Sequence, residues 1–242
     1  MAKKTSAIIA ISEKQKEELV YEHKISPAEK VHVVPLGFDL NRFSEGYNEK
    51  RKNFRSKYKL SEDEIAIGIV GRLVPVKNHS LFLNAIKFLK EKSRKKIKAF
   101  IVGDGEERTM LESKKNELGS TDEIIFTSWE KDVDKVYPGL DIVCLTSFNE
   151  GTPVSIIEAQ AANKPVVSTN AGGIENIVLP GRTAFLSDSA NPNHFFENLF
   201  KLTEDDTLRE NFGKEGSDFV KIKFSYFRLA KDMNAVYASL IR

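Results

Sequence analysis

Two cations and two carboxylates occupy positions from which they could hold one charged, hydroxylated ligand. Arg72 and Lys77 share a short segment that begins with Gly71, and Glu150 and Glu158 are separated by seven residues in EGTPVSIIE. Arginine and lysine side chains bind phosphate oxygens, whereas a carboxylate accepts hydrogen bonds from hydroxyl groups. The pattern favours a diphosphate contact at the two cations and a contact with ligand hydroxyl groups at Glu158. The alternative for Arg72 and Lys77 is two exposed loop cations without a ligand.

The elements that position these residues follow from the hydrophobic pattern. Short β-branched runs without a two-residue alternation are typical of strands covered on both faces, and here they alternate with helical patterns. This order predicts an α/β fold with a parallel sheet and crossover helices. Strands are expected at 7–11, 31–34, 65–70, 99–102, 124–126, 142–145 and 166–168, and helices at 13–23, 48–58, 79–92, 105–118, 153–163, 192–202, 205–221 and 225–240.

The ends of four expected strands carry unusual residues. They are GRL at 71–73, GDG at 103–105, the loop of Glu150, and NAGG at 170–173. Ligands of open α/β sheets bind beyond the carboxyl ends of the strands, where helix N-termini present free N–H groups. We therefore expect all four strand exits to lie at one edge of the sheet and to form one site.

The two glutamates have different expected surroundings. Pro153 is suited to the first position of a helix, which leaves Glu150 in the loop ahead of it. Glu158 follows Val154 and Ile157 at helical spacing and so lies on the apolar stripe. A carboxylate that faces inward needs partners. Glu158 has two possible kinds of partner. One is a structural hydrogen bond to a neighbouring element, and the other is the hydroxyl groups of a ligand.

Composition limits the class of protein. The 242 residues are 40% hydrophobic, enough for a sizeable core, and 37 Lys and Arg against 35 Asp and Glu argue against a nucleic-acid-binding protein. Cys144 lies in an apolar run and is expected as a buried hydrophobe. The basic run 92–98 is expected as a solvated turn, with contact to an anionic surface as the alternative. The apolar stretch 7–11 is too short for a signal peptide core or a membrane span, so a cytoplasmic location is expected.

A boundary is expected near residue 40. Pro, Gly, Asn and Asp collect in PLGFDLNRFSEGYN at 35–48, which is typical of a hinge. The residues ahead of it, 1–40, are too few for an independent α/β domain. They are therefore interpreted as the remnant of a preceding domain together with the hinge, and 41–242 as the ligand-binding domain.

Three further patterns suggest other chemistry and are weaker. GDGEER at 103–108 lacks the third glycine of the nicotinamide dinucleotide fingerprint, and its two glutamates would repel a pyrophosphate. Asp132 and Asp134 could bind a metal ion, but they precede a short expected helix that Asp132 could cap. His79 stands at the start of a helix and is expected as a cap or at the surface rather than as a catalytic group.

The motifs, taken in order, resemble a known family. GRLVPVK at 71–77, VGDG at 102–105, and EGTPVSIIE at 150–158 followed by AQAANKPVVSTNAGG are similar to the retaining glycosyltransferases of family 4, also called glycosyl transferases group 1. The resemblance covers about residues 7–240. It implies the GT-B fold of two facing Rossmann-like domains, with helices on both faces of each parallel sheet. This chain would correspond to the C-terminal, donor-binding half, and 8–43 to the last strands of the N-terminal half and the hinge.

The resemblance also implies roles for individual residues. Arg72 and Lys77 would hold the donor diphosphate, Glu158 the ribose hydroxyls, and Glu150 the hydroxyls of the transferred sugar, with Arg72, Lys77 and Glu150 also serving catalysis. No metal ion would be required. The donor-binding set is then Gly71, Arg72, Lys77, Gly103, Glu150, Gly151, Thr152, Pro153, Val154 and Glu158.

The implied function is transfer of a sugar from a UDP- or GDP-linked donor to a glycan or lipid-linked acceptor, as in polysaccharide biosynthesis. The acceptor would bind through a missing N-terminal domain, with possible peripheral contact at the inner face of the membrane. The chain alone is then expected to bind donor without transferring sugar. The alternatives are a non-catalytic module that binds a sugar nucleotide, and a hydrolase that uses Glu150 and Glu158 as an acid and base pair. A hydrolase leaves the two cations unexplained.

The sequence departs from the family pattern at three positions. Thr152 stands where many members have a bulky residue, and Asn163 replaces a frequent glycine. Ser128 occupies a position often filled by glycine, next to Trp129. The first two substitutions leave donor binding in place as an expectation, and the third leaves the form of the nucleobase pocket open.

Overall fold

The computed structural model describes residues 5–241, and the chain divides into two compact units, one of residues 41–219 and one of residues 1–40 with 220–242. The first four residues of the expected N-terminal segment lie outside the described part. The strands are β1 Ile8–Ala10, β2 Val31–Val33, β3 Glu64–Val70, β4 Lys96–Val102, β5 Ile124–Ser128, β6 Ile142–Leu145, β7 Val166–Thr169 and β8 Ala184–Ser187. The α-helices are α1 Glu13–Glu17, α2 Tyr47–Lys57, α3 His79–Lys92, α4 Arg108–Glu117, α5 Val154–Ala161, α6 Pro192–Glu204, α7 Asp206–Lys223 and α8 Tyr226–Leu240.

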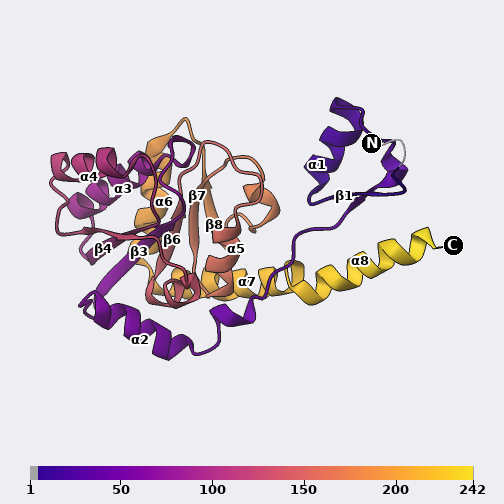
Figure 1. Cartoon of the computed structure of the whole chain (residues 1–242). Helices are drawn as coiled ribbons and strands as arrows, with labels where there is room; N and C mark the ends of the chain where they lie inside the picture. The colour runs from indigo at the N-terminus through magenta and orange to yellow at the C-terminus, as the bar shows by residue number, and fades with distance from the viewer. Residues whose placement is uncertain (1–4, 242) are drawn as a thin grey trace. The chain divides into compact units, whose positions relative to one another are not determined.

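A six-stranded sheet organises the larger unit (Figure 1). Its strand order is β5-β4-β3-β6-β7-β8, and every neighbouring pair is parallel. The central strand β3 pairs Ile67 with Ala99 on one side and with Ile142 on the other. The predicted parallel α/β fold is therefore confirmed. The edge strand β8 was not among the expected strands.

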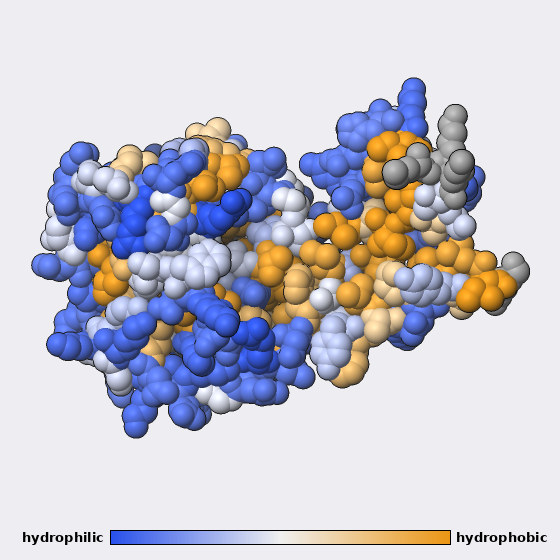
Figure 2. Space-filling view, in the orientation of Figure 1, coloured by the Kyte–Doolittle hydropathy of each residue, from blue (hydrophilic) through white to orange (hydrophobic). Residues whose placement is uncertain are grey.

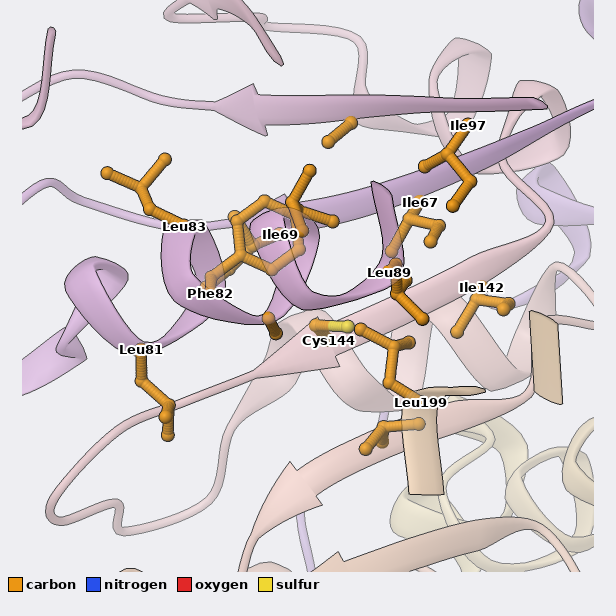
Figure 3. Close-up of a cluster of buried hydrophobic side chains, with 14 of the residues drawn as sticks. Ile67, Ile69, Leu81, Phe82, Leu83, Leu89, Ile97, Ile142, Cys144 and Leu199 are labelled. Carbon is orange, nitrogen blue, oxygen red and sulfur yellow. The ribbon is translucent and has the colours of Figure 1, made fainter. Parts of the chain in front are cut away.

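One face of the sheet is covered by α3, α4 and α6, which bury a continuous aliphatic cluster (Figure 3). Ile67, Ile69 and Cys144 project from the strands toward Phe82 of α3 and Leu199 of α6, and all five are at most 2% exposed. The burial of Cys144 is as predicted, and it raises the pKa of the thiol above its usual range. This face fixes the position of α3, whose first turn follows the segment of Arg72 and Lys77.

The opposite face is covered by α2, α5 and a short turn of 3-10 helix, Tyr137–Gly139. Phe54 of α2 packs its ring edge against Phe100 of β4, with 5.0 Å between the ring centroids. Gly139 is required there, because a Cβ on it would lie 2.1 Å from the Phe54 ring. Helices therefore lie on both faces of the sheet, as expected, and α5 carries Glu158 on the side of Tyr137.

The smaller unit pairs β1 with β2 in a two-stranded parallel sheet and includes α8. Phe38 forms a backbone bridge with Ser225, and the Arg228 guanidinium donates to the carbonyl groups of Pro35 and Leu36. The two units meet in the chain between Leu40 and Asn41. Residues 220–242, which were expected with the larger unit, group with 1–40 through these long-range contacts.

Hydrophobic side chains are exposed mainly in the smaller unit. Figure 2 shows orange surface over the segments that contain β1 and α8. Among the side chains of this unit, Tyr21 is 68% exposed and Phe227 66%. The visible surface of the larger unit is mostly blue. None of the described helices is long and apolar enough to cross a lipid bilayer.

The observed helix boundaries correct two expectations. Pro153 is the N-cap residue and α5 begins at Val154, so proline stands just outside the helix rather than at its first position. The predicted helix 13–23 is α1 followed by a π-helical turn at Glu18–Glu22. Neither difference moves Glu150 out of its loop or Glu158 out of its helix.

Candidate functional site

The exits of β3 and β4 are joined backbone to backbone. The Gly71 N–H donates to the Val102 carbonyl at 3.0 Å, and the Leu73 N–H donates to the Asp104 carbonyl at 3.0 Å. Gly103 has a φ of 142°, and a Cβ on it would lie 1.9 Å from the Gly71 carbonyl oxygen. Only glycine permits this approach, so Gly103 sets how closely the loop of Arg72 lies to the neighbouring strand.

The exits of β6 and β7 are joined in a similar way. The Gly173 N–H donates to the Glu150 carbonyl at 2.9 Å, and the Thr169 hydroxyl donates to the Ser147 carbonyl at 2.7 Å. Gly172 has a φ of 59°, and a Cβ on it would lie 1.8 Å from the Glu150 carbonyl oxygen. The two glycines of AGG therefore fix the loop that presents the Glu150 side chain.

Two contacts join these halves of the edge. The Phe148 N–H donates to the Val76 carbonyl at 2.8 Å, and the Thr146 hydroxyl donates to the Lys77 carbonyl at 2.8 Å. They bind the exit of β3 to the exit of β6, its neighbour in the sheet. All four strand exits singled out in the sequence therefore lie at one edge, as predicted.

Lys77 and Glu150 meet directly at this edge. The Lys77 Nζ lies 2.6 Å from Glu150 Oε1, and the Ser147 hydroxyl donates to the same oxygen at 2.6 Å. The side chains of Lys77 and Glu150 are 23% and 10% exposed, and Ser147 is buried. The structure thus brings the predicted phosphate-binding cation and the predicted sugar-binding carboxylate into one ion pair.

Arg72 differs from Lys77 in having no ion pair recorded within residues 5–241, and its side chain is exposed. It lines a mainly apolar cavity of about 400 Å³ with Gly71, Gly103, Trp129 and Val133. A larger cavity of about 520 Å³ lies between α2 and residues 130–136, and none of the predicted site residues lines it. The cavity that fits the predicted site is therefore the smaller one.

Glu158 lies apart from the Lys77–Glu150 pair and shares no recorded contact with it in the described chain. Its Oε2 accepts a hydrogen bond from the fully buried Tyr137 hydroxyl at 3.2 Å. Burial raises the pKa of the Glu158 carboxyl, while the hydrogen bond from Tyr137 and the nearby charge of Arg42 act to lower it. Tyr137 is thus the structural partner that an inward-facing carboxylate needs, and Oε1 has no recorded partner among the described residues.

The remaining members of the predicted set line the loop between these two glutamates. Gly151 is exposed, Thr152 and Val154 are partly buried, and Pro153 is buried. A Cβ on Gly151 would meet nothing within 4 Å, whereas a Cβ on Gly173 would lie 1.9 Å from the Gly151 carbonyl oxygen. The predicted residues therefore form one continuous loop from Glu150 to the first turn of α5.

The acidic pair at 132 and 134 is occupied by cations of the chain. Asp132 pairs with Lys135 at 2.8 Å, and Asp134 pairs with Arg42 at 2.6 Å and Lys50 at 2.9 Å. Asp132 stands at the N-cap position of a short 3-10 helix but makes no capping hydrogen bond, so its expected capping role is wrong. No cluster of three His, Cys, Asp or Glu side chains suited to a metal ion occurs in residues 5–241.

The prediction for His79 is wrong. It is the first residue of α3 but is only 1% exposed, and neither ring nitrogen has a hydrogen-bond partner among residues 5–241. Burial, with the nearby Lys77 charge, lowers the pKa of the imidazole to about 4, so the ring is neutral at pH 7. Asn78, the N-cap residue of α3, adopts a left-handed conformation, and its side chain makes no capping hydrogen bond within the described residues.

Three functional candidates were missed at the sequence level. Ser147 lies three residues before Glu150 and looks like part of an apolar strand end. Tyr137 and Arg42 are distant from Glu158 in sequence and approach it only through the packing of α5. The exposed Trp129 was noted, and Ser128 beside it adopts a φ of 65°, the conformation that explains the frequent glycine at this position.

Comparison with curated proteins identifies relatives over most of the chain. It is 29% identical to a D-inositol 3-phosphate glycosyltransferase of Corynebacterium jeikeium (strain K411), over 87% of this chain and 52% of the relative. It is also 29% identical to a UDP-Gal:alpha-D-GlcNAc-diphosphoundecaprenol alpha-1,3-galactosyltransferase of Escherichia coli, over 86% and 54% respectively. The chain spans about half the length of these relatives.

Solved structures share the fold. The structure of Anabaena Alr3699/HepE in complex with UDP matches with a TM-score of 0.87 and 21% identity, over 97% of this chain and 64% of that one. WaaG, a glycosyltransferase involved in lipopolysaccharide biosynthesis, matches with a TM-score of 0.79 and 20% identity, over 92% and 60%. These neighbours are GT-B glycosyltransferases, and the larger unit has the Rossmann-like sheet of that fold.

The family described as Glycosyl transferases group 1 matches residues 50–219, which include every member of the predicted donor-binding set. The matched region is also nearly the whole of the larger structural unit. Family motifs, sheet order and the convergence of four strand exits thus agree, and the chain belongs to the group 1 glycosyltransferases.

Proposed function

We propose that this chain is the donor-binding part of a retaining glycosyltransferase that uses a UDP- or GDP-linked sugar. The observation that carries the proposal is the convergence of Arg72, Lys77 and Glu150 at the carboxyl edge of the sheet, with 2.6 Å between Lys77 Nζ and Glu150 Oε1. Two cations and a carboxylate at one sheet edge suit a ligand that has phosphate oxygens on one side and hydroxyl groups on the other.

The geometry suggests an order of contacts along the donor. The nucleobase would enter the apolar cavity of about 400 Å³, where the exposed ring of Trp129 offers a surface for stacking. Arg72 at the rim of the same cavity would hold the diphosphate with Lys77. Glu158 would accept hydrogen bonds from the ribose, and Glu150 from the transferred sugar.

The same residues suit bond cleavage. Negative charge develops on the diphosphate as the bond to the sugar breaks, and fixed cations stabilise charge that appears in the transition state. Arg72 and Lys77 would supply that stabilisation, assisted by N–H groups of the Gly151–Val154 loop. We propose that no metal ion is needed, since both Asp132 and Asp134 already pair with cations of the chain.

Binding of nucleoside diphosphates without metal ions tests this function. UDP or GDP should bind the protein in a buffer that contains a chelator, because side-chain cations replace the divalent ion at the diphosphate. The measurement is titration calorimetry with each nucleotide, in chelator and then in magnesium or manganese. Affinity that appears only with an added divalent ion would contradict the cation account, and no affinity for either nucleotide would contradict the donor-binding function.

Glu158 has a specific expected effect on nucleotide affinity. Glu158→Gln should weaken UDP or GDP by about 1.5 to 3 kcal/mol, the scale of hydrogen bonds to a charged group. Tyr137→Phe should weaken it less, because the hydroxyl only orients the carboxylate. Calorimetry of both variants measures this, with Glu106→Gln, an exposed carboxylate on the β4 exit, as the charge-matched control. Equal nucleotide affinity of Glu158→Gln and wild type would show that Glu158 has only a structural role, through its hydrogen bond with Tyr137.

The proposed acceptor is a glycan or a lipid-linked molecule. The Escherichia coli relative is named for an acceptor on diphosphoundecaprenol, and a capsular polysaccharide biosynthesis glycosyltransferase of Staphylococcus aureus is 27% identical over 97% of this chain. A glycan or lipid-linked acceptor, with peripheral contact at the membrane, fits both. We propose that acceptor binding needs a second α/β domain, since the smaller unit has only β1 and β2 within the described residues.

The second candidate function is a module that binds a sugar nucleotide without transferring the sugar. It requires only the donor contacts at this sheet edge, where Lys77 and Glu150 already lie together. Radiolabelled sugar transfer to lipid-linked or oligosaccharide acceptors distinguishes the two functions. Transfer by the protein with its acceptor-binding domain supports the enzyme, and donor binding without transfer under those conditions supports the module.

A further inference from the structure

The Lys77–Glu150 pair has a consequence for the selectivity of the donor site. Lys77 and Ser147 both donate to Glu150 Oε1, each at 2.6 Å, and the Glu150 side chain is 10% exposed. An ion pair shielded to this extent is screened less by water and salt than a pair on the open surface. In the absence of ligand, Lys77 is therefore occupied by a carboxylate of its own chain.

We propose that Glu150 masks Lys77 whenever no donor sugar is bound, so that the site discriminates against the bare nucleoside diphosphate and releases it after transfer. This inference rests on the proposed donor-binding function and adds a product-release role to Glu150. It also assigns Ser147, which has no role in the proposed donor contacts, as the residue that positions Glu150 for masking.

The discrimination follows from competition for Lys77. A nucleoside diphosphate that recruits Lys77 must draw it away from Glu150 and leave a shielded carboxylate without its cation, which is unfavourable. A sugar donor brings hydroxyl groups that hydrogen-bond to the Glu150 carboxylate and offset this loss. Once the sugar has left, Glu150 regains Lys77, and the diphosphate loses one of its two cations.

The surrounding contacts keep both partners in place for this exchange. The Glu150 carbonyl accepts from Gly173, and Gly172 allows that loop to lie close. The Lys77 carbonyl accepts from Thr146, and the Lys77 Cε would lie 3.9 Å from a Cβ on Gly71, so the lysine side chain extends over the β3 exit. The masking carboxylate and the masked ammonium are thus held in the loops that follow two neighbouring strands, β6 and β3.

Masking affects only one of the two cations. Arg72 is exposed and has no ion pair recorded in the described part of the chain. It remains available to the diphosphate in every state, whereas Lys77 is available only when Glu150 has another partner. The site therefore keeps a basal affinity for nucleotide through Arg72 and gains the second cation with the complete donor.

Titration calorimetry on the 242-residue chain tests the proposal with UDP, GDP, UDP-glucose and GDP-mannose as probes. Glu150→Gln should bind the bare diphosphate about threefold to tenfold more tightly than wild type, the range for a partly shielded ion pair. The same variant should bind the matching sugar donor no better than wild type, so its preference for donor over diphosphate falls. Ser147→Ala should shift affinities in the same direction by a smaller factor.

Two controls separate masking from a general charge effect. Glu106→Gln removes an exposed carboxylate from the same sheet edge and should change diphosphate affinity by less than about twofold. In a Lys77→Met background, Glu150→Gln should no longer tighten the diphosphate, because there is no cation left to release.

The outcomes distinguish this inference from the function on which it rests. Unchanged or weaker diphosphate binding by Glu150→Gln, with wild type binding UDP or GDP, overturns masking and leaves the donor-binding function in place. Tightening that persists in the Lys77→Met background also overturns it. Binding of neither the diphosphates nor the sugar donors by wild type and by Glu150→Gln would overturn both the masking and the proposed function.

Discussion

Arg72→Ala is expected to weaken UDP or GDP binding by about 2 to 5 kcal/mol, the range for truncating one partner of a desolvated charge pair. Arg72 lies on the rim of the cavity of about 400 Å³, and its guanidinium can hold a diphosphate with two parallel hydrogen bonds. Because the side chain is exposed and has no ion pair recorded in residues 5–241, the fold should not depend on it. The loss should therefore appear in binding and leave the free energy of unfolding within about 0.5 kcal/mol of wild type.

Calorimetry and urea unfolding of the same preparation measure the two effects. Arg72→Lys should be intermediate in affinity, since it keeps the charge and loses the paired hydrogen bonds. Arg94→Ala is the matched control, because it removes an exposed arginine from the turn ahead of β4, at the opposite edge of the sheet. Equal nucleotide affinity of Arg72→Ala and wild type would show that Arg72 is an exposed loop cation that does not bind the nucleotide.

Gly172→Ala is expected to lower the free energy of unfolding by about 2 to 4 kcal/mol and to disturb the Glu150 loop. Two costs combine at this position. Its φ of 59° disfavours any residue with a Cβ, and that Cβ would lie 1.8 Å from the Glu150 carbonyl oxygen. The clash is with backbone, so it can be relieved only by moving the loop that presents Glu150.

Gly119→Ala separates the two costs. Gly119 has a φ of 64°, nearly the same as Gly172, but a Cβ there would meet nothing within 4 Å. Urea unfolding should show only the conformational cost for Gly119→Ala, about 1 to 2 kcal/mol. Sugar-donor affinity should fall in Gly172→Ala alone. Equal destabilisation by the two substitutions would show that the Glu150 loop moves at no cost and is not held by AGG.

The sequence by itself determined five of the six strands of the main sheet, the helices between them, and the edge at which the strand exits meet. Unbroken apolar runs such as 65–70 and 142–145 specify strands buried on both faces, and the helical spacing between them specifies the crossovers. Once the sheet is parallel, the strand exits at Gly71, Gly103 and Glu150 must meet, since all parallel strands end at the same edge. Each family motif is also a short contiguous stretch of sequence, so it could be recognised without the tertiary structure.

Only the tertiary structure decided which side chains pair across that edge. The Lys77–Glu150 contact joins residues 73 positions apart, and nothing in either segment indicates that the predicted phosphate ligand and sugar ligand bind each other. The same holds for Tyr137 and Glu158, and for α8, which groups with residues 1–40 through Arg228. His79 illustrates why burial could not be predicted from the sequence. A polar residue at the start of a helix suggests a cap, but His79 is buried because other segments of the chain pack over it. Local periodicity specifies elements, whereas pairing and burial depend on contacts between segments distant in the chain.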